Sequence, residues 1–121
     1  MEKLTSKEQQ AMQVLWKAGK GFVKDFLEIH PEPKPHYNTL SSLVRLLEEK
    51  GYVGHKAYGN THEYFPLISK EEYQREFMSD IVESYFGKSY KNVVSFFAKE
   101  EKISADELRE IIKLIENKKQ N

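Results

Sequence analysis

The sequence predicts a mainly α-helical protein with one small β-hairpin. Apolar residues recur at helical spacing through most of the 121 residues, and most prolines and glycines mark the joints between these stretches. Two short runs rich in aromatic and β-branched residues, Tyr52–Tyr58 and Thr61–Phe65, flank a Gly-Asn pair typical of a hairpin turn. Apolar residues make up 39% of the chain, which is enough for the core of one or two small domains.

The composition excludes several kinds of site. Lys plus Arg and Asp plus Glu both number 19, so the chain has no overall basic bias, although a local basic face stays open. The absence of cysteine excludes disulfides, thiolate catalysis and Cys-ligated metals. The N-terminus is polar and no apolar run approaches the roughly 20 residues of a membrane span, so we expect a cytoplasmic protein without a signal peptide.

Two helices are expected in the first thirty residues. The first runs from about Ser6 to Ala18, with Thr5 as N-cap and Glu8 completing a capping box, and Gly19 ends it. The second runs from about Phe22 to Ile29. The three prolines that follow forbid helix and force an extended turn.

A third helix, from about Tyr37 to Lys50, has two contrasting faces. Its apolar face has residues at i, i+3, i+4 and i+7, namely Leu40, Leu43, Val44 and Leu47. The opposite face repeats this spacing with Asn38, Ser41, Ser42 and Arg45. No acidic residue occurs until the last turn, so the small hydroxyl and amide groups favour close approach to a partner with hydrogen-bonding edges.

Three helices followed by a β-hairpin is the order of a winged helix-turn-helix domain, which we expect over residues 1–67. Residues 68–121 are predicted as three further helices: Lys70–Phe86, Ser89–Lys99, and one that opens with a capping box of Ser104 and Glu107. Each helix has an apolar stripe. A segment of about fifty residues with so many apolar faces is small for independent stability, and oligomerisation is a usual remedy.

Four segments carry a family resemblance: the opening LTSKEQQAMQVLW, the helix HYNTLSSLVRLLEEKGYV, the hairpin GHKAYGNTHEYFPL and the tail FFAKEEKISADELREII. In this order they cover nearly the whole chain, and it resembles the penicillinase-repressor (BlaI/MecI) family of transcription regulators. The resemblance implies a homodimeric winged-helix repressor that binds an operator in double-stranded DNA, with the C-terminal helices forming the dimer and a sensor protease as a possible partner.

Two departures from the family pattern concern recognition and induction. Family members that repress β-lactamase operons carry basic residues at the positions of Asn38 and Ser41, so their operator sequence does not carry over, although Thr39 and Arg45 match. Those members are inactivated by cleavage of an Asn-Phe bond that aligns with Phe96-Phe97, where the Asn is lost. The absence of cysteine excludes the mechanism of the copper-sensing branch.

The candidate DNA-binding residues lie on the third helix and the hairpin. A recognition helix enters the major groove with its N-terminal half, where Asn38 either pairs with adenine or caps the helix. Arg45 either contacts phosphate or forms a surface salt bridge with one of the two glutamates in the last turn. Lys56 and His62 are candidates for phosphate or minor-groove contact, unless the hairpin is simply exposed and polar. The full predicted set is Asn38, Thr39, Ser41, Ser42, Arg45, Lys56, Tyr58, Asn60 and His62.

The candidate dimer interface collects the apolar stripes of the tail. Its predicted members are Tyr73, Phe77, Ile81, Tyr85, Val93, Val94, Phe97, Leu108, Ile111, Ile112 and Ile115. Two alternatives stay open: a winged-helix module that docks proteins, and a ligand-responsive repressor whose tail aromatics line a pocket. We expect no catalytic site, cofactor or metal, because the four histidines form no ligand motif and no nucleophile or phosphate-binding motif occurs.

Overall fold

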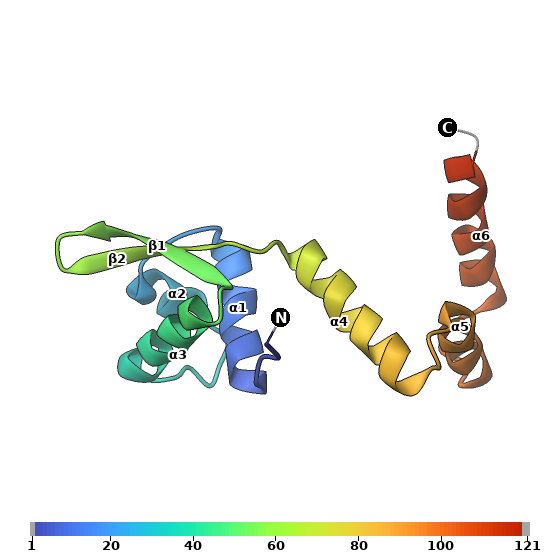
Figure 1. Cartoon of the computed structure of the whole chain (residues 1–121), viewed down its shortest axis with the longest axis horizontal. Coiled ribbons are helices and arrows are strands. Elements are labelled where there is room, and N and C mark those ends of the chain that lie inside the picture. Colours follow the sequence, from blue (N-terminus) through green and yellow to red (C-terminus); the bar gives the residue numbers. More distant parts are fainter. Residues whose placement is uncertain (1, 120–121) are drawn as a thin grey trace. The chain divides into compact units, whose positions relative to one another are not determined.

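The computed structural model describes residues 2–119, which form six helices and a two-stranded antiparallel sheet (Figure 1). The elements in chain order are α1 (Ser6–Ala18), α2 (Val23–Ile29), α3 (Tyr37–Glu49), β1 (Val53–Tyr58), β2 (Thr61–Pro66), α4 (Lys70–Tyr85), α5 (Tyr90–Lys99) and α6 (Ala105–Lys119). This confirms the predicted fold class, and the predicted element boundaries lie within one residue of those observed. None of the described helices is long and apolar enough to span a membrane.

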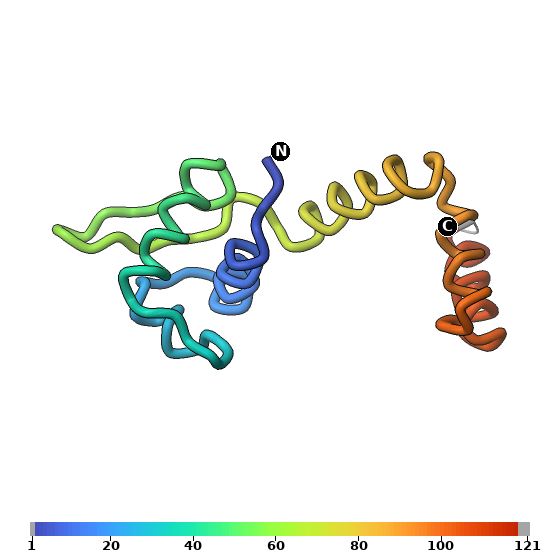
Figure 2. Tube along the Cα trace, turned by 90° about the horizontal axis from the view of Figure 1, so that it is seen from below, coloured from blue at the N-terminus to red at the C-terminus, as the bar shows by residue number. Residues whose placement is uncertain are grey.

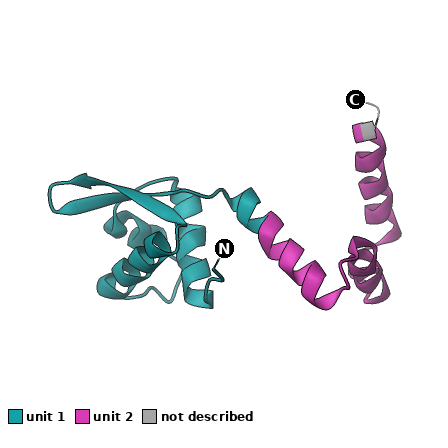
Figure 3. Cartoon of the chain, in the orientation of Figure 1, with its two compact units in different colours: residues 1–74 teal, residues 75–121 magenta. Residues whose placement is uncertain are grey.

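The chain divides into two compact units, residues 1–74 and 75–121 (Figure 3). The first unit contains α1 to α3, the hairpin and the start of α4. It reaches beyond residue 67 because Tyr73 packs against its core, with the Tyr73 ring 5.5 Å from that of Trp16 and 6.0 Å from that of Tyr52. Tyr73, which we expected at the dimer interface, therefore lies in the first unit.

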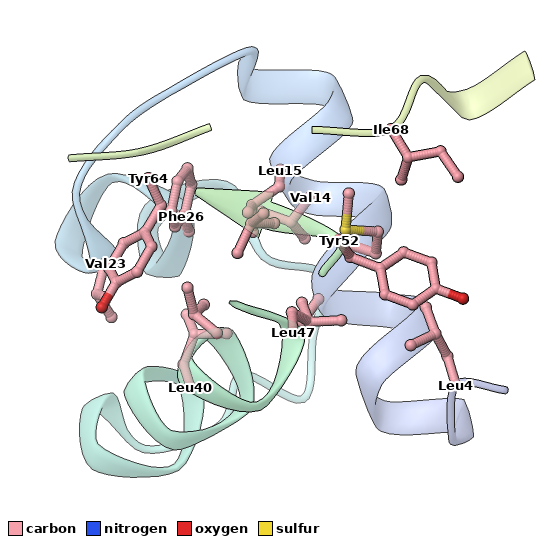
Figure 4. Packing of buried hydrophobic residues seen from close by; sticks show 14 residues of the cluster. Leu4, Val14, Leu15, Val23, Phe26, Leu40, Leu47, Tyr52, Tyr64 and Ile68 are labelled. Atoms are coloured by element: carbon pink, nitrogen blue, oxygen red, sulfur yellow. The ribbon is translucent and has the colours of Figure 1, made fainter. Parts of the chain in front are cut away.

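The core of the first unit forms where α1, α2, α3 and the hairpin meet (Figure 4). Met12, Leu15, Phe26, Leu40 and Leu47 are all fully buried. Burial of each such side chain stabilises the fold by roughly 1.5–3 kcal/mol relative to exposure. The apolar stripe predicted for α3 is thus turned inward, and the polar face opposite it is turned to solvent.

The two strands of the hairpin pair residue by residue, from Val53 opposite Pro66 to Tyr58 opposite Thr61. Gly59 in the turn has a φ of 60°, a conformation that glycine adopts without steric cost. In two perpendicular views the turn of the hairpin extends beyond the three helices (Figures 1 and 2).

A short extra pairing joins the segment before α2 to the hairpin. The amide of Gly21 donates to the carbonyl of Tyr64 at 3.0 Å, and the amide of Tyr64 donates back to Gly21 at 2.8 Å. A Cβ at position 21 would lie 3.2 Å from the ring of Phe26, so glycine permits this close approach. The pairing fixes the first turn of α2 beside β2.

Capping fixes the start of several helices. The predicted capping box of α1 is confirmed, because Thr5 Oγ1 accepts from the Glu8 amide at 3.2 Å while Glu8 Oε1 accepts from the Thr5 amide at 2.8 Å. The box predicted before α6 is also present, between Ser104 and Glu107.

The second unit has a sparse interior. Among its described side chains only Val82 and Val93 are buried apolar residues. Many large apolar side chains are instead exposed: Phe77, Met78, Tyr85, Tyr90, Val94, Phe96, Phe97, Ile111, Ile112, Leu114 and Ile115. Large apolar side chains that stay exposed in this number are unusual on the surface of a monomeric protein.

Candidate DNA-binding surface

The outward face of α3 presents neutral hydrogen-bonding groups and one cation. Asn38, Thr39, Ser42 and Arg45 are exposed and Ser41 is half-buried. These five predicted residues share one side of the helix because their spacing follows its 3.6-residue period. The helix thus places an amide, three hydroxyls and a guanidinium where a partner can reach them.

The start of α3 decides between the two interpretations of Asn38. The N-cap is His36, which makes no side-chain capping hydrogen bond, and Asn38 is the second residue of the helix. Asn38 is therefore not the N-cap of α3, and its side-chain amide is exposed. The free amide groups of the first turn add a partial positive charge at this end of α3.

Arg45 is available for an external partner. Its Nη2 donates to Ser42 Oγ at 3.4 Å, a long and exposed hydrogen bond within the same helix. The salt bridge considered from the sequence, with Glu48 or Glu49, does not occur in the described part of the chain. Glu48 is instead paired with His55 of β1, which ties the end of α3 to the hairpin.

The hairpin side chains interact with one another. His62 stacks on His55 with ring centroids 4.0 Å apart and an interplanar angle of 8°. Lys56 Nζ lies 5.2 Å above the ring of Tyr58, within cation–π distance. Thr61 Oγ1 donates to the Tyr58 carbonyl at 2.8 Å and closes the turn. The four predicted hairpin residues, Lys56, Tyr58, Asn60 and His62, are all exposed.

A groove of about 520 Å³ lies between α2, α3 and the hairpin. It brings together several predicted residues from different elements, and it adds others that the sequence reasoning missed. Its lining residues are Phe22, Val23, Lys24, Tyr37, Ser41, Arg45, Asn60, Thr61, His62 and Tyr64. The predicted residues Asn38, Thr39, Ser42, Lys56 and Tyr58 do not line it.

Tyr64 supplies a proton donor to this groove. Burial raises the pKa of the Tyr64 phenol, and the nearby Glu48 carboxylate raises this pKa further. A phenol is protonated at neutral pH even at its ordinary pKa of 10, so Tyr64 is neutral and can donate a hydrogen bond. In the described part of the chain no group of three or more His, Cys, Asp or Glu side chains is arranged to hold a metal ion.

An exposed polar helix beside a β-hairpin, both held on a helical core, is the arrangement of a winged-helix domain. The penicillinase repressor family model matches residues 4–117, nearly the whole chain. The chain belongs to the penicillinase repressor family, a family of DNA-binding transcription repressors.

Individual relatives agree with this assignment. The chain is 19% identical over 116 residues to the methicillin resistance regulatory protein MecI of Staphylococcus aureus (strain N315), which covers 95% of this chain and 94% of the relative. The MecI protein of Mammaliicoccus sciuri has the same identity and coverage. The solution structure of the DNA binding domain of the repressor BlaI shares the fold with a TM-score of 0.51 and 23% identity, over 60% of this chain and 94% of that one.

Proposed function

We propose that the protein is a homodimeric transcription repressor that binds a roughly palindromic operator with α3 in the major groove. The observation that carries this proposal is the exposed face of α3, whose neutral donors and acceptors match the edges of bases. Residues 1–67 supply DNA binding in this proposal, and residues 68–121 supply dimerisation.

The two ends of the recognition face have different roles. Asn38 lies in the first turn, where a helix in the major groove approaches base edges, and its amide suits adenine. Arg45 lies two turns further along, where phosphate contact is the more usual role. The remaining hydroxyl groups donate to phosphate or contact a thymine methyl; these belong to Thr39, Ser41 and Ser42.

The hairpin makes a second and less specific contact. Lys56 and His62 extend from opposite strands on the exposed part of the hairpin, where they reach phosphates or the neighbouring minor groove. The net charge of the α3 and hairpin surface is small, so one monomer binds DNA weakly. Linking two copies raises the affinity for DNA, because binding of the first copy raises the effective concentration of the second.

The second unit provides the dimer contacts. Phe77, Tyr85 and Ile115 are 44%, 80% and 53% exposed in a single chain, which leaves an apolar surface that a second copy would cover. The other predicted interface residues that are exposed are Val94, Phe97, Ile111 and Ile112, while Ile81 and Leu108 are half-buried. Val93 is buried in the single chain, so it adds little to the apolar surface that a second copy would cover.

The route of induction differs from single cleavage after an Asn. Phe96 and Phe97 are 47% and 38% exposed on α5, with their rings 5.4 Å apart, so the bond lies within an aromatic cluster. A sensor protease of the family type would meet Phe where it expects Asn. Repression is therefore relieved by altered cleavage, by a ligand or by a partner protein.

The proposal is tested by an electrophoretic mobility shift with genomic fragments at several salt concentrations. We expect sequence-selective binding whose affinity falls steeply with salt, and a weaker, less salt-dependent complex for Arg45→Ala. The matched control is Arg109→Ala, which removes the same charge from an exposed ion pair on α6. Salt-independent binding, or no binding by a folded protein, would favour a protein-docking module instead.

A further inference from the structure

The groove between α2, α3 and the hairpin has a consistent electrostatic character. Lys24 comes from α2, Arg45 from α3 and His62 from β2, so three elements each contribute a basic side chain. No acidic side chain is among the described residues that line it. A cleft lined by one sign of charge concentrates the field and attracts ions of the opposite sign.

Two of the acidic groups nearby have partners of their own. Asp25, next to Lys24, accepts the Phe22 amide through Oδ2 at 2.9 Å. Glu48, near Arg45, is paired with His55. These carboxylates therefore offer less competition for the cations of the groove, which remain exposed to an external anion.

Neutral donors complete the lining. Asn60 supplies an amide at the hairpin turn, Ser41 and Tyr37 supply hydroxyls from α3, and the protonated phenol of Tyr64 supplies another. Hydroxyl, amide and basic side chains together are the usual donors to phosphate oxygens in protein–DNA complexes. The lining thus matches an extended polyanion better than a base edge.

The position of this protein groove in the proposed complex indicates that the polyanion is a strand of the DNA duplex. Adjacent major and minor grooves of a duplex are separated by one sugar-phosphate backbone. If α3 occupies the major groove and the hairpin reaches the neighbouring minor groove, this backbone must pass between α3 and the hairpin. The groove lies at that position, because the Gly21–Tyr64 pairing holds α2 beside β2.

We infer that this groove holds the phosphodiester backbone of one DNA strand, with Lys24 of α2 as a phosphate contact in addition to Arg45 and His62. The inference rests on the proposed DNA binding and deepens it. It assigns α2 a direct part in holding DNA, where the sequence had indicated only α3 and the hairpin. Lys24 positions the protein on the duplex and reads no sequence.

The test compares Lys24→Ala with Lys17→Ala, which removes the same charge from an exposed residue outside this groove. For the unmodified full chain and both variants, Kd is measured for a bound genomic fragment and for a scrambled duplex across a series of salt concentrations. We expect Lys24→Ala to raise Kd about fivefold for both duplexes and to lower the salt slope by about one, with Lys24→Arg restoring both. Circular dichroism establishes that each variant is folded.

Three outcomes would overturn the inference. If Lys24→Ala and Lys17→Ala bind alike while the unmodified protein binds DNA, the groove does not hold the backbone, but the proposed function stands. If Lys24→Ala loses only the preferred fragment, Lys24 reads bases. If inorganic phosphate at millimolar concentration binds to the unmodified protein but not to Lys24→Ala, and does not compete with DNA, the groove is a site for small anions.

Discussion

The pairing of Glu8 with Lys50 connects α1 to the end of α3 and is the contact whose loss we expect to weaken the first unit most clearly. The Glu8 side chain is only 3% exposed, and its Oε1 accepts from Lys50 Nζ at 2.9 Å and from the Thr5 amide at 2.8 Å. Its Oε2 is buried without a hydrogen-bond partner. Replacing Lys50 by Met therefore leaves a buried carboxylate with one donor.

The magnitude follows from these contacts. A hydrogen bond to a charged group contributes about 1.5–3 kcal/mol, and breaking a fully buried ion pair costs about 3–5 kcal/mol. Because the Lys50 side chain is 21% exposed, solvent screens the pair and the lower range applies. We expect Lys50→Met to lower the free energy of unfolding by about 2 kcal/mol at neutral pH.

The pH dependence of the stability provides a second test of the contact between Glu8 and Lys50. Burial alone raises the pKa of Glu8, but hydrogen bonds from Lys50 and from Thr5 outweigh it, so the pKa lies below the ordinary value of 4.5. A carboxyl whose folded pKa is depressed stabilises the fold above its unfolded pKa, and this contribution is lost as pH falls through the folded value. The unmodified protein should therefore lose stability below about pH 4.5 more steeply than Glu8→Gln.

Urea denaturation followed by circular dichroism measures both effects. The control is Lys7→Met, an exposed lysine next to Glu8 on α1. Glu8→Gln combined with Lys50→Met should lose less stability than the sum of the two single changes, because the unpaired charge is gone. The reasoning is wrong if Lys50→Met is as stable as Lys7→Met, or if Glu8→Gln leaves the acid dependence unchanged.

Three further predictions concern packing, assembly and the hairpin. Trp16→Phe removes the 2.9 Å hydrogen bond from Nε1 to the Ile68 carbonyl and should cost about 1 kcal/mol, measured by thermal unfolding. Ile111→Asp should dissociate the proposed dimer and abolish tight operator binding while the first unit stays folded. If light scattering shows that the unmodified protein is a monomer at micromolar concentration, the proposed dimer is refuted. Lys56→Ala with His62→Ala should weaken specific and non-specific DNA equally in a filter-binding assay, whereas a selective loss of operator binding would make the hairpin a base reader.

The helices and the hairpin were predictable because their signals are local. Capping residues such as Thr5 and Ser104 define helix starts, the periodicity of α3 separates its two faces, and Gly59-Asn60 defines the turn. Each of these signals spans a few residues. The polar face of α3 followed directly from the same spacing.

The groove and its contacts were not predictable in this way. Lys24 lines the same groove as the hairpin residues because Gly21 pairs with Tyr64, a contact between distant segments that no local spacing indicates. Periodicity likewise indicated that Tyr73 is on an apolar stripe, but it did not indicate which surface this stripe packs against. The structure places the Tyr73 ring against Trp16. The pairing of Glu48 with His55 joins the end of α3 to β1 across the turn between them, and neither the helical nor the strand period indicates it.

Hydroxyl-radical footprinting of a bound genomic fragment tests the central claim most directly, because it shows where and how α3 meets DNA. Two α3 helices presented by a dimer should protect two patches on one side of the duplex, about one or two helical turns apart, with related sequences. In the same fragment with single base-pair substitutions, Asn38→Ala should lose the preference at one base position in each patch, and Arg45→Ala should weaken protection throughout. A single patch, or protection that neither variant changes, would contradict the assignment of α3 as the recognition helix of a dimeric repressor.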